Sequence, residues 1–293
     1  MITLLTGSTG QLGRELRRTV PEDVDLITPT RAEMDLRDAD HVARTVAESG
    51  AELIINAAAY TAVDGAEDEP DLAYSINGDG PGHLARALAR RGGRMIQIST
   101  DFVFSGESGS PYAPDSPTDP VGVYGASKLE GEKQVMAELP ATSIVLRTAW
   151  VYSRYGRNFV KTMLRLMTER EHIEVVADQV GSPTWAFGLA QTIWTLALQH
   201  QTAGIFHWTD AGVASWYDFA VAIRDEARRL GCLGIDCRIE PTRARERGSR
   251  AARPPFSVLD KSSTWAVLGQ KSQHWRVQLG SMLQETEMGE DHE

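Results

Sequence analysis

The sequence predicts an α/β protein: a Rossmann-type, doubly wound parallel sheet with a smaller C-terminal substrate-binding subdomain. Apolar strands alternate with helical patterns through the first half of the chain, and a glycine-rich loop follows the first strand. Polar residues gather where several of the strands end. Strict alternation of strands and helices is typical of a parallel sheet that is covered by helices on both faces.

The expected elements follow one another in order. Strands are predicted at residues 2–5, 24–28, 53–56, 95–99 and 144–147, and helices between them at 11–20, 41–48, 70–90 and 124–138. The pattern then loosens into helices at 158–169 and 186–199 and short strands at 173–176 and 204–208. We assign residues 1–150 to the sheet domain, to which some later segments return. Residues 151–293 form mainly the subdomain and end in an acidic tail, 285–293, that we expect to be frayed.

The first 13 residues read MITLLTGSTGQLG, a short apolar strand that runs into a turn and the start of a helix. Gly7, Gly10 and Gly13, with Thr9 in the turn, would let the backbone bend sharply and approach a pyrophosphate, to which the helix N-terminus offers N–H groups. The spacing is G-x-x-G-x-x-G instead of the commoner G-x-G-x-x-G, so a purely structural turn is the alternative. The strand directly before the loop favours a dinucleotide site.

The end of the second predicted strand indicates which dinucleotide binds. It reads Pro29-Thr30-Arg31, where an NAD-selective site usually has a carboxylate for the ribose hydroxyls. A guanidinium and a hydroxyl instead suit a 2′-phosphate, through charge-assisted hydrogen bonds. Residues 1–150 are therefore expected to bind NADPH, with NADH as the alternative. Asp35 is displaced from the ribose-reading position and would lie near the adenine or cap the next helix.

A tyrosine and a lysine stand four residues apart in the segment YGASK, as Tyr124 and Lys128. On a helix this spacing places both side chains on one face. The ammonium group would lower the pKa of the phenol from about 10 toward working pH, which makes a proton donor for alcohol and carbonyl chemistry. The alternative is a surface tyrosine packed on a lysine stem.

Small or polar residues follow three of the predicted strands. Ala57, Ala58 and Ala59 would let the cofactor lie close to the backbone, although this run alone also fits a small-residue packing seam. Thr100-Asp101 follows the fourth strand, and Trp150 stands just after the fifth. Because open parallel sheets bind ligands at the carboxyl ends of their strands, we expect these residues to converge on one crevice.

Eight segments together carry a resemblance to a known family: GSTGQLG, NAAAYTAVDGAE, STDFVFSG, YGASKLEGE, RTAWVYSRYGRNFVKTML, VVADQVGSPT, SWYDFA and RPPFSVLD. From residue 1 to Asp260 they resemble the dTDP-4-dehydrorhamnose reductase family of the extended short-chain dehydrogenase/reductase superfamily. The resemblance implies reduction of the C4 keto group of dTDP-4-dehydro-β-L-rhamnose by NADPH, in dTDP-rhamnose biosynthesis. Its catalytic residues carry over to Thr100, Tyr124 and Lys128. Tyr124 would donate the proton, Thr100 would hold the sugar oxygen, and Lys128 would tune the phenol and hold the nicotinamide ribose.

The same resemblance places further residues around the ligands. Cofactor contacts carry over to Gly10, Gln11, Leu12, Asp35, Leu36, Ala57, Ala58 and Ala59. Contacts with the dTDP-sugar carry over to Asp101, Trp150, Ser182 within Gly181-Ser182-Pro183-Thr184, and Arg253. A core position is the alternative for Trp150.

The resemblance leaves the metal and the oligomeric state open. Some relatives dimerise around a magnesium ion that carboxylates hold, and Glu15 matches one of these carboxylates. The stretch after GSPT, however, reads WAFGLAQT and contains no acid. No complete Mg²⁺ site is therefore predicted, and both a monomer and a homodimer are compatible with the sequence.

Two other function classes fit part of the pattern. A non-catalytic NADP-binding regulatory subunit is disfavoured because Thr100, Tyr124 and Lys128 are all present. A nucleotide-sugar epimerase or dehydratase of the same superfamily is the second alternative. Dehydratases usually have an acid pair after the strand-end threonine, whereas Asp101 is followed by Phe102.

Charge and composition disfavour a nucleic acid, a membrane or a zinc ion as a partner of this chain. The net charge of −10 disfavours a nucleic-acid surface. No apolar segment reaches the roughly 18 residues of a membrane span, and the N-terminus does not resemble a signal peptide, so we expect a cytoplasmic protein. Cys232 and Cys237 are expected to be thiols, because such a compartment is reducing and no histidine is nearby to complete a zinc site.

Overall fold

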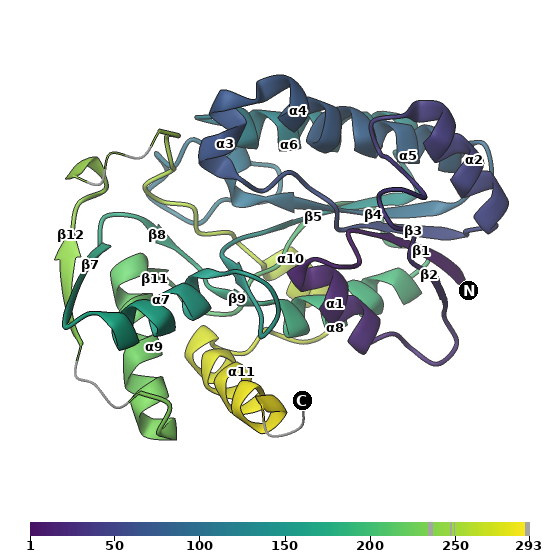
Figure 1. Ribbon diagram of the computed structural model, residues 1–293. Coiled ribbons are helices and arrows are strands. Elements are labelled where there is room, and N and C mark those ends of the chain that lie inside the picture. Colours follow the sequence, from purple (N-terminus) through teal and green to yellow (C-terminus); the bar gives the residue numbers. More distant parts are fainter. Residues whose placement is uncertain (234–236, 247, 249, 291–293) are drawn as a thin grey trace.

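The computed structural model describes residues 1–233, 237–246, 248 and 250–290. It consists of a sheet half and a C-terminal lobe that lie one above the other in Figure 1. The sheet has six parallel strands in the order β10-β5-β4-β3-β1-β2. Their bounds are β1 Ile2–Thr6, β2 Asp25–Ile27, β3 Leu53–Asn56, β4 Arg94–Thr100, β5 Ser143–Thr148 and β10 Gly204–His207. The predicted doubly wound parallel sheet is confirmed.

Helices cover both faces of this sheet (Figure 1). One face carries α1 (Gln11–Arg18), α8 (Ala186–Leu198) and α10 (Ser262–Leu268), which share a core with the strands. The other face carries α2 (Ala39–Ser49), α5 (Gly80–Ala89) and α6 (Val123–Glu138), which bury a second core. Residues 186–198 and 204–207 thus return to the sheet half from late in the chain.

The single helix predicted for residues 70–90 is built from three consecutive pieces. They are α4 (Pro70–Tyr74), a π-helical turn η1 (Ser75–Asp79) and α5, with a further short helix α3 (Val63–Asp68) before them. Pro81 has no N–H group to donate to the carbonyl of Asn77, so the regular hydrogen-bond ladder breaks at this point. A π-turn is a common way of absorbing such a break, and it is frequent near functional sites.

The C-terminal lobe packs three helices and short strands around its own apolar core. The helices are α7 (Phe159–Glu169), α9 (Trp216–Leu230) and α11 (Trp275–Glu290), and a short 3₁₀ turn, η3 (Ala244–Glu246), follows β12. Another short 3₁₀ turn, η2 (Asp101–Val103), follows β4 in the sheet half. The strand pairs are β6 (Val151–Tyr152) with β9 (Thr184–Trp185), β7 (His172–Val176) with β12 (Arg238–Thr242), and β8 (Val180–Gly181) with β11 (Ala214–Ser215). The regular alternation of strands and helices is lost after Trp150 because these strands are short and pair with segments distant in the sequence.

Three smaller expectations can be compared with the structure. Helix α11 continues to Glu290, so the acidic tail is helical over residues 285–290, and residues 291–293 lie outside the described part. Cys232 and Cys237 form no disulfide bond with each other. Within the described ranges, no helix has the length and apolar character that crossing a bilayer requires.

Candidate active site

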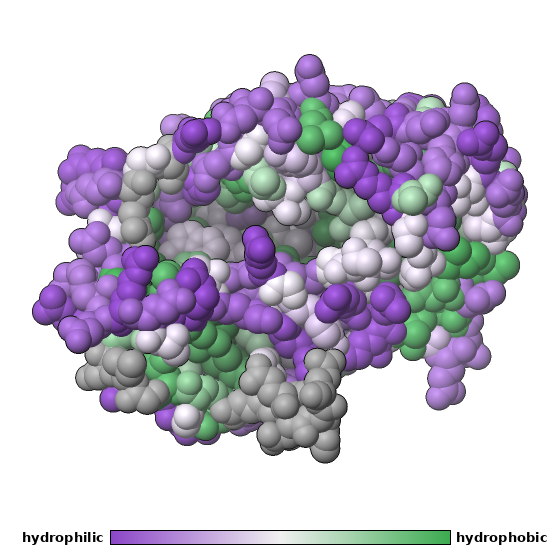
Figure 2. All heavy atoms as spheres, viewed as in Figure 1, coloured by the Kyte–Doolittle hydropathy of each residue, from purple (hydrophilic) through white to green (hydrophobic). Residues whose placement is uncertain are grey.

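A cleft of about 760 Å³ lies at the carboxyl ends of the sheet strands. Figure 2 shows the hollow between the sheet half and the C-terminal lobe. The residues that line it come from the glycine loop, from the ends of β3, β4 and β5, from α6, and from the lobe at Trp216 and Arg253. This is the expected crevice, and it brings together most of the residues predicted from separate segments.

The glycine loop of residues 7–13 fits a pyrophosphate. Gly7 has a φ of 68°, and a Cβ there would lie 2.6 Å from the backbone of Ala57 and Ala58. A Cβ on Gly13 would collide with the carbonyl oxygen of Gly7. Helix α1 begins after Gly10 without a side-chain cap, so its first N–H groups are available to an anion at the cleft. The loop residues predicted to bind the cofactor, Gly7, Thr9, Gly10, Gln11, Leu12 and Gly13, all line the cleft.

The alanine run after β3 is fixed by two buried asparagines. Asn56 accepts a hydrogen bond from the N–H of Ala58 at 3.2 Å and donates to Gln97 at 2.7 Å. Asn77, in the π-turn, accepts from the N–H of Tyr60 at 2.8 Å and donates to its carbonyl at 3.1 Å. Ala57, Ala58 and Ala59 consequently line the cleft with their backbone held in place.

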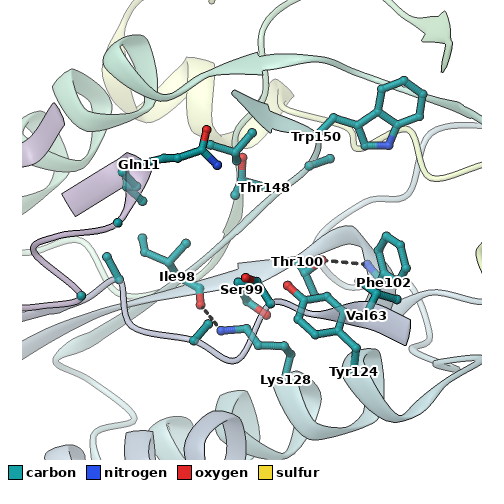
Figure 3. Close-up of a pocket in the computed structure, with 18 of the residues that line it drawn as sticks. Gln11, Val63, Ile98, Ser99, Thr100, Phe102, Tyr124, Lys128, Thr148 and Trp150 are labelled. Carbon is teal, nitrogen blue, oxygen red and sulfur yellow. Dashed lines mark hydrogen bonds between the residues drawn. The ribbon is translucent and has the colours of Figure 1, made fainter. Parts of the chain in front are cut away.

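Tyr124 and Lys128 project from one face of α6 toward the end of β4, as Figure 3 shows. Lys128 is buried, and its Nζ donates to the carbonyl of Ile98 at 2.7 Å. Thr100 ends β4, and its hydroxyl donates to Asp101 Oδ1 at 3.1 Å and accepts the N–H of Phe102 at 3.2 Å. In Figure 3 it lies beside the phenol of Tyr124. Helix α6 lies this close to Phe102 because Gly125 has no side chain, since a Cβ there would overlap the Phe102 carbonyl.

The pKa values of Tyr124 and Lys128 differ from those that the sequence predicted. Burial raises the pKa of Tyr124 to about 12; the hydrogen bond from Thr100 lowers it and the charge of Asp101 raises it. Burial also lowers the pKa of Lys128 to about 8, against the opposing effect of Glu132. The expected lowering of the Tyr124 pKa by Lys128 is therefore wrong in this structure, because desolvation of the phenolate dominates. At neutral pH the phenol keeps its proton, which is the form that a proton donor needs.

A buried ion pair anchors α6 one turn beyond Lys128. Glu132 and Arg147 are 2–3% exposed, and Arg147 Nη2 lies 2.7 Å from Glu132 Oε2. Ser99, which lines the cleft, donates its hydroxyl to the same carboxylate, and Arg147 also donates to the carbonyl of Pro114. These contacts tie α6 to the ends of β4 and β5.

The opposite wall of the cleft includes Trp150, Trp216 and Arg253. Trp150 stacks on Trp216 with ring centroids 3.5 Å apart. Arg253 Nη2 pairs with Asp64 at 2.9 Å and lies half-buried at the cleft. Asp101, on the sheet side, is 2% exposed, and burial raises its pKa to about 6. Trp150 is thus a cleft residue and is not part of a closed core.

Five predicted residues do not line this cleft. Ser182 is fully buried and donates its hydroxyl to the carbonyl of Gly212 at 2.8 Å, so its predicted substrate contact is wrong. The other four, Thr30, Arg31, Asp35 and Leu36, belong to the segment after β2, outside the cleft lining. Asp35 pairs with Arg37 at 2.6 Å, and Asp38, instead of Asp35, caps α2. Their cofactor contacts stay predictions.

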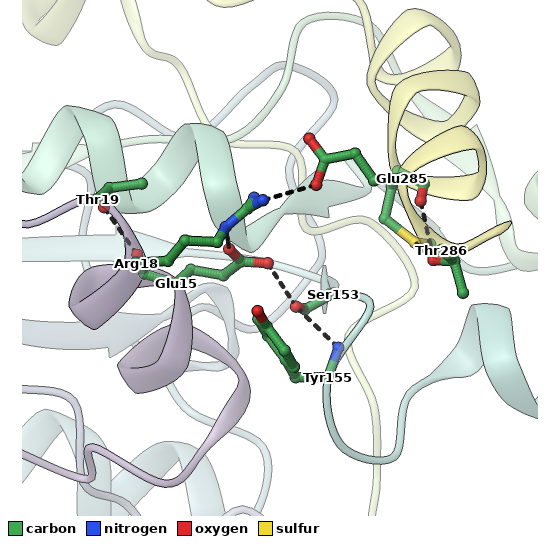
Figure 4. Close-up of polar contacts among 8 residues, drawn as sticks. Glu15, Arg18, Thr19, Ser153, Tyr155, Glu285 and Thr286 are labelled. Atoms are coloured by element: carbon green, nitrogen blue, oxygen red, sulfur yellow. Dashed lines mark hydrogen bonds and ion pairs between the residues drawn. The ribbon is translucent and has the colours of Figure 1, made fainter. Parts of the chain in front are cut away.

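Glu15 is held by protein groups, as Figure 4 shows. Its carboxylate accepts from Ser153 at 2.7 Å and from Arg18 at 2.9 Å, and Arg18 also pairs with Glu285 at 2.8 Å. The guanidinium of Arg18 lies 4.3 Å from the ring centroid of Phe187. Arg18 therefore lies between the two carboxylates and pairs with both. The described residues contain no group of three or more acidic, histidine or cysteine side chains that would hold a metal ion.

Sequence reasoning missed several residues of the site. Trp216 belongs to the quoted segment SWYDFA, yet nothing in its local pattern indicates that it meets Trp150 from a distant part of the chain. Asn77 and Glu132 were missed because both lie inside helical stretches. A buried polar residue on the apolar face of a predicted helix is a usable signal for such positions.

Comparison with known proteins agrees with this geometry. A family model described as "RmlD substrate binding domain" matches residues 1–288. The chain is 41% identical over 283 residues to a dTDP-4-dehydrorhamnose reductase of Streptomyces griseus, covering 94% of this chain and 91% of that protein. A crystal structure of a dTDP-4-dehydrorhamnose reductase from Clostridium acetobutylicum superposes with a TM-score of 0.92 at 37% identity, over 98% of this chain and 100% of that one. The Bacillus anthracis dTDP-4-dehydrorhamnose reductase in complex with NADP gives 0.91 at 36% identity, over 97% and 99%.

Proposed function

The chain belongs to the RmlD family of dTDP-4-dehydrorhamnose reductases, and from this premise we propose that it reduces the C4 keto group of dTDP-4-dehydro-β-L-rhamnose to give dTDP-β-L-rhamnose, with NADPH as reductant. The observation that carries this proposal is the arrangement of Tyr124 and Thr100 beside Lys128, in a cleft that begins at the glycine loop. A relative of 36% identity binds NADP in its solved structure.

The cofactor half of the cleft suits a dinucleotide. The helix N-terminus after Gly10 and the close approach at Gly7 would accept the pyrophosphate. The alanine run would lie along the middle of the cofactor, and Lys128 would donate to the nicotinamide ribose. We place Arg31 and Thr30 at the 2′-phosphate, with Asp35 and Leu36 on the adenine side. NADPH supplies the hydride when it is bound.

The protein groups then act on the sugar. Tyr124 donates its proton to the C4 oxygen as negative charge develops there, and Thr100 holds that oxygen by a hydrogen bond. The neutral phenol that burial favours carries the proton before the step. Lys128 keeps its place beside Tyr124 because its stem is held by the surrounding core and its Nζ donates to the carbonyl of Ile98. Asp101, Trp150 and Arg253 complete the substrate side of the cleft.

The test is a turnover assay with the purified protein, NADPH and authentic dTDP-4-dehydro-L-rhamnose. We expect loss of nicotinamide absorbance and formation of dTDP-L-rhamnose, with no consumption of NADPH when dTDP-glucose replaces the substrate. NADPH binding without turnover of the authentic substrate would contradict the reductase function and favour a regulatory role.

A further inference from the structure

Trp150 has an unusual backbone conformation. Its φ is 49°, and among the described residues it is the only one other than glycine with a positive φ. It lies between β5 and β6, where the chain passes from the sheet half into the C-terminal lobe. Its carbonyl accepts the N–H of Thr184 at 3.2 Å, and β6 pairs with β9 directly afterwards. A bulky residue adopts this conformation only where its surroundings compensate the strain.

Two residues of the lobe confine the indole of Trp150. Trp216 stacks on it with the two ring planes within 5° of parallel and the centroids 3.5 Å apart. Gly181 lies against its edge, where a Cβ would be 2.6 Å from Cε2, so that only glycine leaves room for the ring in this orientation.

The fold brings these two supports together and fixes them. Gly181 belongs to β8, which pairs with β11 through Ala214, two residues before Trp216. Ser215 then caps α9: its hydroxyl accepts the N–H of Asp218 at 3.0 Å, which sets the first turn of the helix. Phe159 contacts Trp216 at a centroid distance of 4.6 Å. The support for Trp150 is therefore built from three separate elements of the lobe.

The confined indole lies on the substrate side of the cleft. In Figure 3, Trp150 lies across the cleft from Tyr124, and Gln11 of the glycine loop lies toward the other end. Trp150 and Trp216 both line the cleft. The 6-deoxy sugar of the proposed substrate presents C–H groups and a methyl group, which pack well on an aromatic face.

We propose that Trp216 and Gly181 are positioning residues that hold the Trp150 indole in one orientation, as a rigid wall against which the sugar of the nucleotide sugar is placed for reduction. The proposal rests on the proposed function. It predicts that disturbing either support weakens recognition of the sugar and leaves recognition of the cofactor and of the nucleotide unchanged.

The experiment compares Trp216→Ala, Trp216→Phe and Gly181→Ala. Trp216→Ala and Gly181→Ala should raise KM for the keto sugar nucleotide about three- to tenfold, the scale of one lost aromatic contact. The dissociation constant of NADPH should not change. Trp216→Phe, which keeps a flat ring, should restore most of the affinity. Trp265→Phe and Gly109→Ala serve as matched controls, because Trp265 is not a cleft residue and a Cβ on Gly109 meets no atom within 4 Å.

Calorimetry separates sugar recognition from nucleotide recognition. Trp216→Ala and Gly181→Ala should bind dTDP-L-rhamnose more weakly and dTDP as well as the unmodified protein does. An unchanged KM in both variants would overturn the proposal, as would equal weakening for dTDP or for NADPH. If the unmodified protein neither turns over the keto sugar nor binds dTDP-L-rhamnose, the proposed function itself fails, which is a distinguishable outcome.

Discussion

The two walls of the cleft are built in different ways. The sheet wall consists of strand ends and α6. Its Thr100, Lys128 and Glu132 side chains are buried and held by hydrogen bonds and by the ion pair with Arg147. The lobe wall consists of turns, short strands and the start of α9, and its aromatic and charged side chains are held by stacking and by a half-buried ion pair. Under the proposed function, the sheet wall, where atoms are fixed closely, would carry the chemistry, and the lobe wall would recognise the sugar.

The largest expected effect is on the sheet wall. Tyr124→Phe removes the proposed proton donor and keeps the ring that packs edge-to-face on Phe102. We expect the turnover rate to fall about 10²- to 10⁴-fold, the usual contribution of a positioned general acid. NADPH affinity, measured by fluorescence titration, should be retained. A near-normal rate in this variant would show that Tyr124 is not the proton donor.

The second prediction concerns the buried ion pair. Glu132→Gln leaves the Arg147 guanidinium buried without its carboxylate, which should lower the unfolding free energy by about 3–5 kcal/mol. Glu130→Gln, two residues earlier on the same helix, is the control and should change it by less than about 0.5 kcal/mol. Urea unfolding measures both. Similar values for the two variants would show that the ion pair does not hold the sheet wall together.

Lys128→Met tests whether the buried ammonium of Lys128 lowers the unfolding free energy of the protein. The pKa of Lys128 is lowered to about 8 in the folded protein, so its ammonium destabilises the fold at pH 7. The folded state binds fewer protons than the unfolded state between about pH 8 and 10, so the penalty fades as pH rises through that window. The variant should be inactive yet more stable at pH 7, on the order of 1–3 kcal/mol, and the gain should shrink toward pH 10. Loss of stability at pH 7 would contradict this.

The smallest effect is expected outside both walls, at the exposed segment after β2. Arg31→Ala should reduce the preference for NADPH over NADH about tenfold, because an exposed charge-assisted contact is worth little more than 1 kcal/mol. The measurement is the ratio of kcat/KM for the two cofactors. An unchanged ratio would show that Arg31 does not read the 2′-phosphate.

The sheet wall was predictable from the sequence because local patterns encode it. The glycine loop, the strand-end residue Thr100 and the spacing of Tyr124 and Lys128 each depend on one element and its period, and all of them line the cleft. The raised pKa of Tyr124 was not predictable, because spacing along a helix does not reveal how much solvent the fold removes.

The lobe wall was predictable only in part. Trp150 was assigned to the cleft, but its stacking on Trp216 depends on the pairing of β8 with β11, which joins segments distant in the sequence. Ser182 was predicted to contact the substrate, whereas in the structure its hydroxyl donates to the carbonyl of Gly212. The two ion pairs of Arg18, with Glu15 and with Glu285, were also not predictable, because Glu285 belongs to α11, which is far from Arg18 in the sequence.

The most direct test of the central claim follows the hydride to the sugar. The purified protein would reduce dTDP-4-dehydro-L-rhamnose with NADPH that carries deuterium at the transferred C4 position of the nicotinamide, and the product would be examined by NMR. We predict dTDP-L-rhamnose with deuterium bound to C4 of the sugar. Product without deuterium at C4, from NADPH labelled on either face of the nicotinamide, would contradict hydride transfer in this cleft.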